Sequence, residues 1–252
     1  MDGLRWCIET SMISSTIKAA WTIVTTVIYT VIICIPIILV APFSPQGKAT
    51  YRLGWTWAWL LMKTNRVRMQ VEGLEKVLCS RSYVFIANHA SNLDPPAVAL
   101  ALKNQLRFIG KKSLARVPLF GSAVRLARMI LIDRDDSHGA RRTIDMAITD
   151  LRDGISAIFF AEGTRSVDGR LQAFKKGGVM LALKAKLPIV PITIVNSHRL
   201  LPKNAVSIKA GLMRIIIGDP IDTSGYGEQD RDLLTELVRS VIGRNLELCN
   251  QG

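Results

Sequence analysis

The chain has 252 residues, of which 49% are hydrophobic, with four cysteines and a formal net charge of +13. This content supports a substantial core in one large domain or two small ones, and the cysteine spacing indicates neither a disulfide framework nor a zinc site. The charge suits anionic lipids, phosphate esters or acidic proteins, whereas nucleic acid is disfavoured because no helix-turn-helix, zinc-finger or RNA-binding sheet pattern is present.

The first predicted element is an apolar segment near the N-terminus. Residues 19–47 contain no charged side chain, and a helix of about 20 residues is long enough to cross the hydrocarbon core of a bilayer. Pro36 leaves a second possibility, because a kink there turns the segment into a hairpin that enters one leaflet. In either form, the tryptophans at positions 21, 55, 57 and 59 suit the lipid interface.

Basic residues are denser after the apolar segment than before it. The preceding stretch carries two basic and two acidic residues. The basic residues that follow are Lys48, Arg52, Lys63, Arg66 and Arg68. By the positive-inside rule, we expect residues 1–65 to form a helical anchor in the cell inner membrane and residues 66–252 to form a domain on its cytoplasmic face.

The remaining chain alternates short apolar runs with helical patterns. Runs of strand length cover residues 67–71, 83–87, 106–109, 129–132, 155–161, 189–195, 206–210 and 214–218. Helical patterns cover residues 95–103, 121–128, 140–152, 177–186 and 230–248. Strands that alternate with helices predict an α/β fold, with a mixed, largely parallel sheet covered by helices on both faces.

The most informative motif, NHASNLD, follows the apolar run at residues 83–87 and occupies residues 88–94. A neutral imidazole accepts a proton near pH 7, and a nearby carboxylate fixes its tautomer. Two prolines after Asp94 predict that a helix begins there, so His89 and Asp94 can meet across a strand-loop-helix junction. The spacing alone fits a purely structural interpretation as well as a catalytic one: Asp94 only caps the helix, and His89 is an ordinary polar residue at the end of a strand.

Polar residues also follow other predicted strands, where ligands of open α/β sheets usually bind. The sequence AEGTRS at residues 161–166 supplies a glycine turn, a hydroxyl and a guanidinium that suits phosphate oxygens. Arg134 follows the run at residues 129–132, and Lys111 follows the run at residues 106–109. Taken alone, each of these also fits a common loop or a solvated surface charge.

In this order and spacing, the motifs resemble the glycerolipid acyltransferase family, and in particular its short bacterial members. The motifs lie at residues 88–94, 132–134, 160–166 and 188–191, with Lys111 between the first two. The resemblance covers residues 71–221 and implies the α/β fold of glycerol-3-phosphate acyltransferases. Ala161 departs from the family, which commonly has proline there, but the functional side chains are unaffected.

The resemblance also implies roles for individual residues. His89, oriented by Asp94, would be the general base that takes the proton of a hydroxyl as that hydroxyl attacks a thioester. The phosphate of the acceptor would be held by Lys111, Arg134, Glu162, Gly163, Thr164 and Arg165. A thioester is reactive enough that we expect no metal and no other cofactor.

The implied reaction acylates lysophosphatidate at its sn-2 hydroxyl and gives phosphatidate for phospholipid biosynthesis. Acyl-CoA and acyl carrier protein both remain possible donors, since both carriers are acidic and residues 103–142 hold ten Lys or Arg against three Asp. Another lysolipid or glycerol 3-phosphate remains possible as the acceptor. The alternative from a different class is a catalytically inactive, membrane-tethered binder of anionic lipid, which the intact His89 and Asp94 disfavour.

Overall fold

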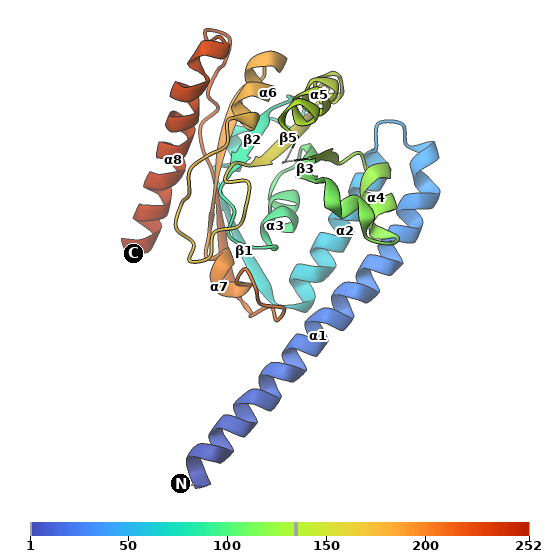
Figure 1. The fold of residues 1–252 in the computed structure, drawn as a ribbon, viewed down its shortest axis with the longest axis vertical. Helices are drawn as coiled ribbons and strands as arrows, with labels where there is room; N and C mark the ends of the chain where they lie inside the picture. The colour runs from blue at the N-terminus through green and yellow to red at the C-terminus, as the bar shows by residue number, and fades with distance from the viewer. Residues whose placement is uncertain (1, 134–135, 252) are drawn as a thin grey trace.

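The computed structural model describes residues 2–133 and 136–251, and within them seven strands form one sheet (Figure 1). The strands are β1 (Val67–Glu72), β2 (Val84–Ala87), β3 (Gln105–Lys111), β4 (Ile130–Ile132), β5 (Ile155–Phe160), β6 (Ile189–Val195) and β7 (Gly211–Ile217). Their order across the sheet is β1-β7-β6-β2-β5-β3-β4. Strands β6 and β7 pair antiparallel, and all other neighbours pair parallel. The predicted mixed, largely parallel sheet is confirmed.

The central strands are apolar along their whole length. Every residue of β2 and β6 is buried, whereas β7 mixes buried and partly exposed residues. A strand covered on both faces has no side that faces solvent, so it needs a continuous apolar sequence. The predicted strand at residues 206–210 is wrong: the segment is irregular, and Ile208 N–H donates to Thr22 Oγ1 of the N-terminal helix instead of to a neighbouring strand.

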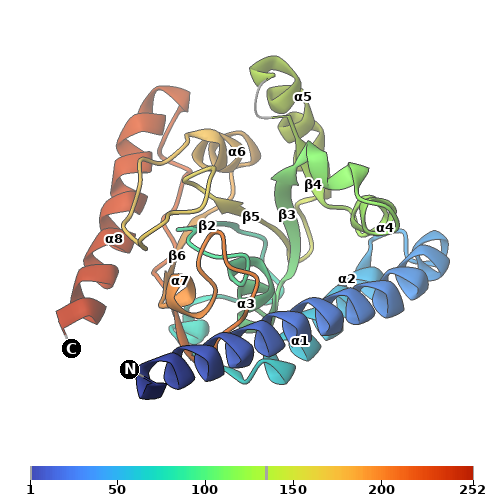
Figure 2. The same cartoon turned by 60° about the horizontal axis from the view of Figure 1, so that its bottom comes forward.

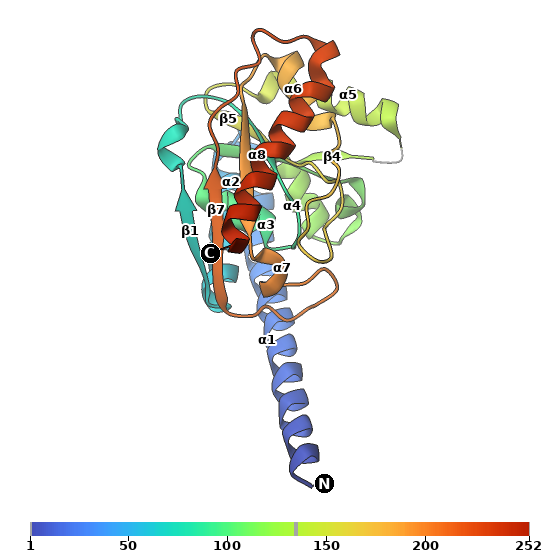
Figure 3. The same cartoon turned by 90° about the vertical axis from the view of Figure 1, so that its left-hand side faces the viewer.

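Helices cover both faces of the sheet, as the sequence predicts (Figure 3). The helices are α1 (Asp2–Val40), α2 (Lys48–Thr64), α3 (Asp94–Ala101), α4 (Phe120–Leu126), α5 (Ser137–Ala147), α6 (Gly177–Ala185), α7 (Ser197–Leu200) and α8 (Arg231–Gln251). Short 3-10 helices lie at Ala41–Phe43, Leu74–Lys76, Lys112–Arg116, Ile148–Asp150 and Glu228–Asp230.

Alternate residues of β2 divide the core between the two faces. Phe85 and Ala87 pack in one buried cluster with residues of α2 and α3. Val84 and Ile86 pack in the other, with residues of α6 and α8. The period of two along a strand therefore places α3, which begins at Asp94, on the α2 side of the sheet.

The N-terminal helix α1 is continuous and includes Pro36. The chain does not turn back at Pro36; it reverses through residues 41–47, and α2 then runs back beside α1 (Figure 2). Proline removes one backbone hydrogen bond but has a φ that suits a helix, so α1 continues for one more turn. Among the described residues, one helix, Thr16–Phe43, is long and apolar enough to cross a membrane.

Among the residues whose burial the structure describes, only one side of α1 packs against other parts of the chain. Ile33, Cys34 and Ile37 are buried beside Ala123 of α4, and the Tyr29 hydroxyl forms a 2.8 Å hydrogen bond with the hydroxyl of Thr64 in α2. The other side exposes Ile17, Trp21, Val24, Ile28, Ile32, Ile35 and Leu39. These seven residues are called the apolar stripe below. The helix thus joins the core on one side and presents an unpartnered apolar surface on the other.

This packing predicts that Ile33→Ala destabilises the fold and that Ile32→Ala does not. Ile33 is 8% exposed and Ile32 is 57% exposed, so only the first substitution leaves a cavity. Truncating a buried Ile to Ala costs about 2–5 kcal/mol, whereas surface changes stay within about 0.5 kcal/mol. Unfolding of both variants in mild detergent measures the difference. Equal losses would contradict the packing of α1 on the domain.

Candidate functional site

Two neighbouring parallel strands end side by side at the candidate site. Ala87, the last residue of β2, pairs with Phe160, the last residue of β5. Because the carboxyl ends of parallel strands meet at one edge of a sheet, the residues that follow them are brought together there. His89 N–H donates to Glu162 Oε1 at 2.7 Å. Two motifs that the sequence separates by 73 positions therefore form one site.

The predicted histidine and aspartate are in contact. His89 Nδ1 lies 2.7 Å from Asp94 Oδ2, and the N–H groups of Ala90 and Ser91 each donate to the same oxygen at 2.8 Å. Asp94 is the first residue of α3, and its side chain is fully buried. Because a carboxylate only accepts hydrogen bonds, Nδ1 carries a proton, and in a neutral imidazole Nε2 then has the lone pair. The side chain of Asp94 therefore orients His89 and does not cap α3.

The main chain on both sides of His89 is fixed as well. The side-chain amide of Asn88 donates to Ile194 O of β6 at 2.9 Å and accepts from Ile194 N–H at 2.8 Å. His89 O accepts Ser166 N–H at 2.8 Å. The imidazole lies against the Phe160 ring, with 4.5 Å between ring centroids, and its side chain is 16% exposed. His89 is thus held from three neighbouring segments and still reaches solvent.

Glu162 is buried next to the main chain of His89. Its second oxygen, Oε2, accepts Gln172 N–H at 3.3 Å, so backbone donors bind both carboxylate oxygens. Burial raises the pKa of Glu162 to about 7; the charge of Asp94 acts in the same direction, and the two N–H groups oppose it. The recorded partners of Glu162 are thus main-chain N–H groups of the protein, and the expected contact with a phosphate stays a prediction.

The turn after Glu162 contacts Lys203, a cation that the sequence pattern did not predict. Gly163 has a φ of 72°, in the left-handed region that glycine adopts without strain. Arg165 Nη1 donates to the carbonyl oxygen of Lys203 at 2.8 Å, and Lys203 Nζ donates to Thr164 Oγ1 at 3.3 Å. The sequence signal for Lys203 is its position after the strand at residues 189–195, which the same rule of strand ends covers.

The other two predicted cations are placed differently. Lys111 is the last residue of β3 and is exposed. Since β5 lies between β2 and β3, two strand spacings, about 10 Å, separate the strand of Lys111 from that of His89. Arg134 lies outside the described residues, so its contribution to the site stays a prediction.

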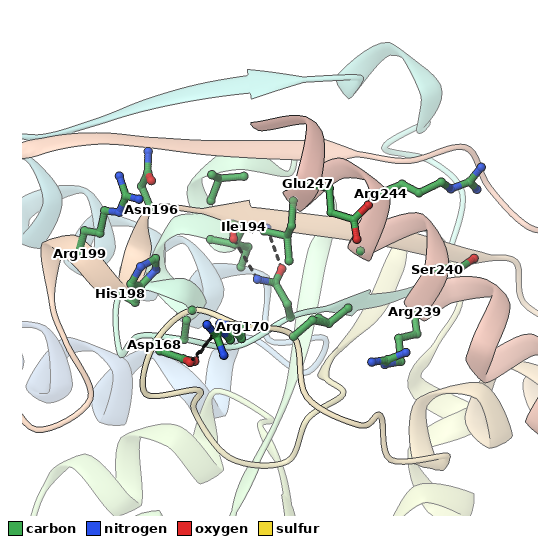
Figure 4. Close-up of a pocket in the computed structure, with 17 residues that line it drawn as sticks. Asp168, Arg170, Ile194, Asn196, His198, Arg199, Arg239, Ser240, Arg244 and Glu247 are labelled. Atoms are coloured by element: carbon green, nitrogen blue, oxygen red, sulfur yellow. Dashed lines mark hydrogen bonds and ion pairs between the residues drawn. The ribbon is translucent and has the colours of Figure 1, made fainter. Parts of the chain in front are cut away.

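A basic cleft of about 760 Å³ adjoins the site on the side of α8 (Figure 4). Asn88 and Ala90, which flank His89 in the chain, line it together with Gly169 and residues of α8. Its arginines are Arg170, Arg199, Arg239 and Arg244. Figure 4 shows Arg199 and Arg239 at opposite ends of the cleft. His89 is not among its lining residues, so the cleft meets the site at the two residues that flank His89.

Comparison with known proteins identifies the family of the chain. Residues 68–195, half of the chain, match the model of the Acyltransferase family. A 1-acyl-sn-glycerol-3-phosphate acyltransferase of Salmonella typhimurium is 31% identical over 217 residues, which cover 84% of this chain and 86% of that protein. A chloroplastic enzyme of the same name from Brassica napus is 33% identical over 185 residues, which cover 73% of this chain and 52% of the relative. The chain thus spans about half the length of its chloroplastic relatives.

A solved structure shares the fold over nearly the whole length. The 1-acyl-sn-glycerophosphate acyltransferase from Thermotoga maritima aligns with a TM-score of 0.72 and 24% identity, over 95% of this chain and 97% of that one. The structural likeness establishes the fold, and the sequence match over the motifs establishes the relationship. The chain belongs to the acyltransferase family.

Proposed function

We propose that the protein acylates lysophosphatidate at its sn-2 hydroxyl and so forms phosphatidate for phospholipid biosynthesis. The relatives from Salmonella typhimurium and Brassica napus are named for this activity. The structural observation that carries the proposal is the 2.7 Å contact between His89 Nδ1 and Asp94 Oδ2 at the end of β2. This contact leaves Nε2 free to face a substrate hydroxyl.

The proposed reaction needs one proton to move twice. His89 Nε2 takes the proton of the sn-2 hydroxyl while the oxygen bonds to the thioester carbonyl carbon. The carbon-sulfur bond then breaks, and the imidazolium returns the proton to the departing thiolate sulfur. The charge of Asp94 stabilises the imidazolium between the two transfers. General-base assistance of this kind is worth about 10² to 10⁴ in rate.

Arg165, with Thr164 and Gly163 of the same turn, is proposed to hold the acceptor phosphate. Arg165 is half-buried, which limits the positions that its guanidinium can take. Lys111 and Arg134 are proposed to add positive charge from the next strand ends. Holding the phosphate fixes the neighbouring hydroxyl against His89, which is how substrate binding contributes to rate.

Glu162 is proposed to position His89 and not to bind substrate. Its carboxylate accepts the main-chain N–H of His89 at 2.7 Å, next to the point where the imidazole branches from the chain. The same carboxylate accepts Gln172 N–H, which fixes the far end of the phosphate-binding loop. One buried group thus connects the proposed base with the proposed phosphate site.

The donor is proposed to be a thioester of coenzyme A or of acyl carrier protein, with the domain on the cytoplasmic face of the inner membrane. Both carriers are acidic, and the basic residues of positions 103–142 suit either. The apolar stripe of α1 supports membrane attachment. A cavity at the end of α2 is lined by Lys63, Arg66 and Arg68, which favour the anionic lipids of a cytoplasmic leaflet.

Purified protein, labelled acyl-CoA or acyl carrier protein and a panel of acceptors test the proposed function. Lysophosphatidate should be acylated faster than glycerol 3-phosphate and faster than other lysolipids. His89→Ala should lower turnover at least about a hundredfold with unchanged thermal unfolding, and Asp94→Asn should also be severe because the countercharge is lost. Lysophosphatidate that stays inert with both donors would overturn the function. Turnover above about a tenth in His89→Ala would remove His89 as the base.

Arg165→Ala is expected to raise the KM for lysophosphatidate about tenfold and to leave the KM for the donor unchanged. The reason is the loss of one charge-assisted contact to the phosphate. Kinetics at varied acceptor and saturating donor measure the effect. Arg152→Ala is the matched control, because Arg152 is exposed near the start of β5, at the opposite end of that strand. A raised KM for the donor alone would assign Arg165 to the acyl carrier.

Glu162 should make the stability of the fold depend on pH. Burial raises its pKa from the ordinary value of 4.5 to about 7, so the folded chain holds the proton more tightly than the unfolded chain. The resulting stabilisation, at most about 3 kcal/mol, is complete below pH 4.5 and is lost as the pH rises through 7. The free energy of unfolding of the wild type minus that of Glu162→Gln should therefore fall from pH 5 to pH 8. A difference that stays flat or rises would contradict the raised pKa.

A further inference from the structure

Lys203 brings a second positive charge to the turn that carries Arg165. Its Nζ donates to Thr164 Oγ1 at 3.3 Å, and its carbonyl oxygen accepts Arg165 Nη1 at 2.8 Å. Lys203 thus contacts two consecutive residues of this turn, the hydroxyl of Thr164 through its ammonium and the guanidinium of Arg165 through its carbonyl oxygen. We propose that Lys203 and Arg165 bind the phosphate of lysophosphatidate between them, an assignment that rests on the proposed function.

Within residues 2–133 and 136–251, these two cations form no recorded ion pair with an acidic side chain. In the described part of the chain, the recorded ion pairs include neither Arg165 nor Lys203. The adjacent carboxylate, Glu162, has both oxygens bound to backbone N–H groups. Both cations belong to residues that contact this turn, so an anion bound at the turn is attracted by both charges. The electrostatics of the turn therefore favour a ligand with at least one negative charge.

Both cations keep hydrogen-bond donors for such a ligand. A guanidinium has five N–H groups. The recorded bond of the Arg165 side chain uses one of them, on Nη1, to donate to the carbonyl oxygen of Lys203. An ammonium has three donors, and the recorded bond of Lys203 uses one of them. Both residues are half-buried, so the protein limits the positions of their side chains while leaving them in contact with solvent. Phosphate, with several acceptor oxygens, matches this set of donors.

The segment that carries Lys203 is tied to the motif of the proposed base. Ser91 Oγ donates to Leu201 O at 2.8 Å, two residues before Lys203. Ser91 N–H donates to the Asp94 carboxylate, which also binds His89. A phosphate bound at Lys203 is therefore positioned relative to the His89 imidazole by a short series of hydrogen bonds. Such positioning is what brings an adjacent hydroxyl to the base.

The same segment also contacts the N-terminal helix. Ile208 N–H donates to Thr22 Oγ1 at 3.3 Å. Near Thr22, α1 exposes Ile17 and Trp21 of the apolar stripe. A lysophosphatidate whose acyl chain lies in a bilayer keeps its phosphate at the lipid surface. The segment that contains Lys203 and Ile208 therefore lies next to α1, whose exposed apolar side chains suit contact with lipid.

Lys203→Ala removes the ammonium with its bond to Thr164 and keeps the carbonyl oxygen that accepts Arg165. We expect the KM for lysophosphatidate to rise about tenfold and the KM for the donor to change less than twofold. Binding of lysophosphatidate in mixed micelles without donor should weaken by the same factor, and Lys203→Arg should restore most of both. Lys209→Ala, an exposed lysine of the same segment, is the matched control and should stay within twofold of wild type.

A phosphate-free acceptor separates phosphate binding from a purely structural role. Monoacylglycerol offers a hydroxyl and no phosphate, so Lys203→Ala should leave its binding and kcat/KM unchanged. Equal losses on both acceptors, or an unchanged KM and affinity for lysophosphatidate, would overturn the assignment of Lys203. A wild-type protein that acylates neither acceptor would overturn the proposed function instead, so the two failures are distinct.

Discussion

The buried carboxylate of Asp94 is the group on which the whole site depends. Burying a carboxylate without hydrogen-bond donors costs several kcal/mol, and here three donors converge on Oδ2. They come from the consecutive residues His89, Ala90 and Ser91. The carboxylate therefore dictates the turn that follows β2 as well as the orientation of the imidazole. The same carboxylate thus fixes the main chain of the turn and provides the negative charge next to the imidazole of the proposed base.

A second carboxyl group, that of Glu162, holds the same histidine from another side. Asp94 receives the ring of His89, and Glu162 receives its main-chain N–H, each at 2.7 Å. The pKa of Glu162 is raised to about 7 by burial and by the charge of Asp94, so near neutral pH a proton removes part of its charge. Two carboxylates close together thus have separate tasks, because their environments differ. Asp94 supplies the countercharge to the ring, and Glu162 supplies a fixed acceptor to the backbone.

The sequence predicted the pair His89 and Asp94 and the loop at residues 161–166, but it missed Lys203 and the partners of Glu162, for physical reasons. His89 and Asp94 are five residues apart, and the prolines after Asp94 mark the start of the helix at that residue, so their contact follows from short-range rules. Glu162 was assigned to the right loop, but its partners are backbone N–H groups, which no side-chain pattern marks. Lys203 meets Thr164 across 39 residues of sequence. That contact needs the strand order β6-β2-β5, which the alternation of strands and helices does not specify.

The N-terminal helix shows why composition could not separate a membrane anchor from a core helix. Ile32 and Ile33 are the same residue type at adjacent positions, yet one is exposed and the other is buried against the domain. A free membrane span would face lipid on every side. This helix instead uses one side to hold the domain, and on that side Thr22 accepts the N–H of Ile208, in the segment that carries Lys203. If the apolar stripe lies in lipid, as proposed, the height of the phosphate site above the bilayer is set by packing inside the protein, and the anchor becomes part of acceptor recognition.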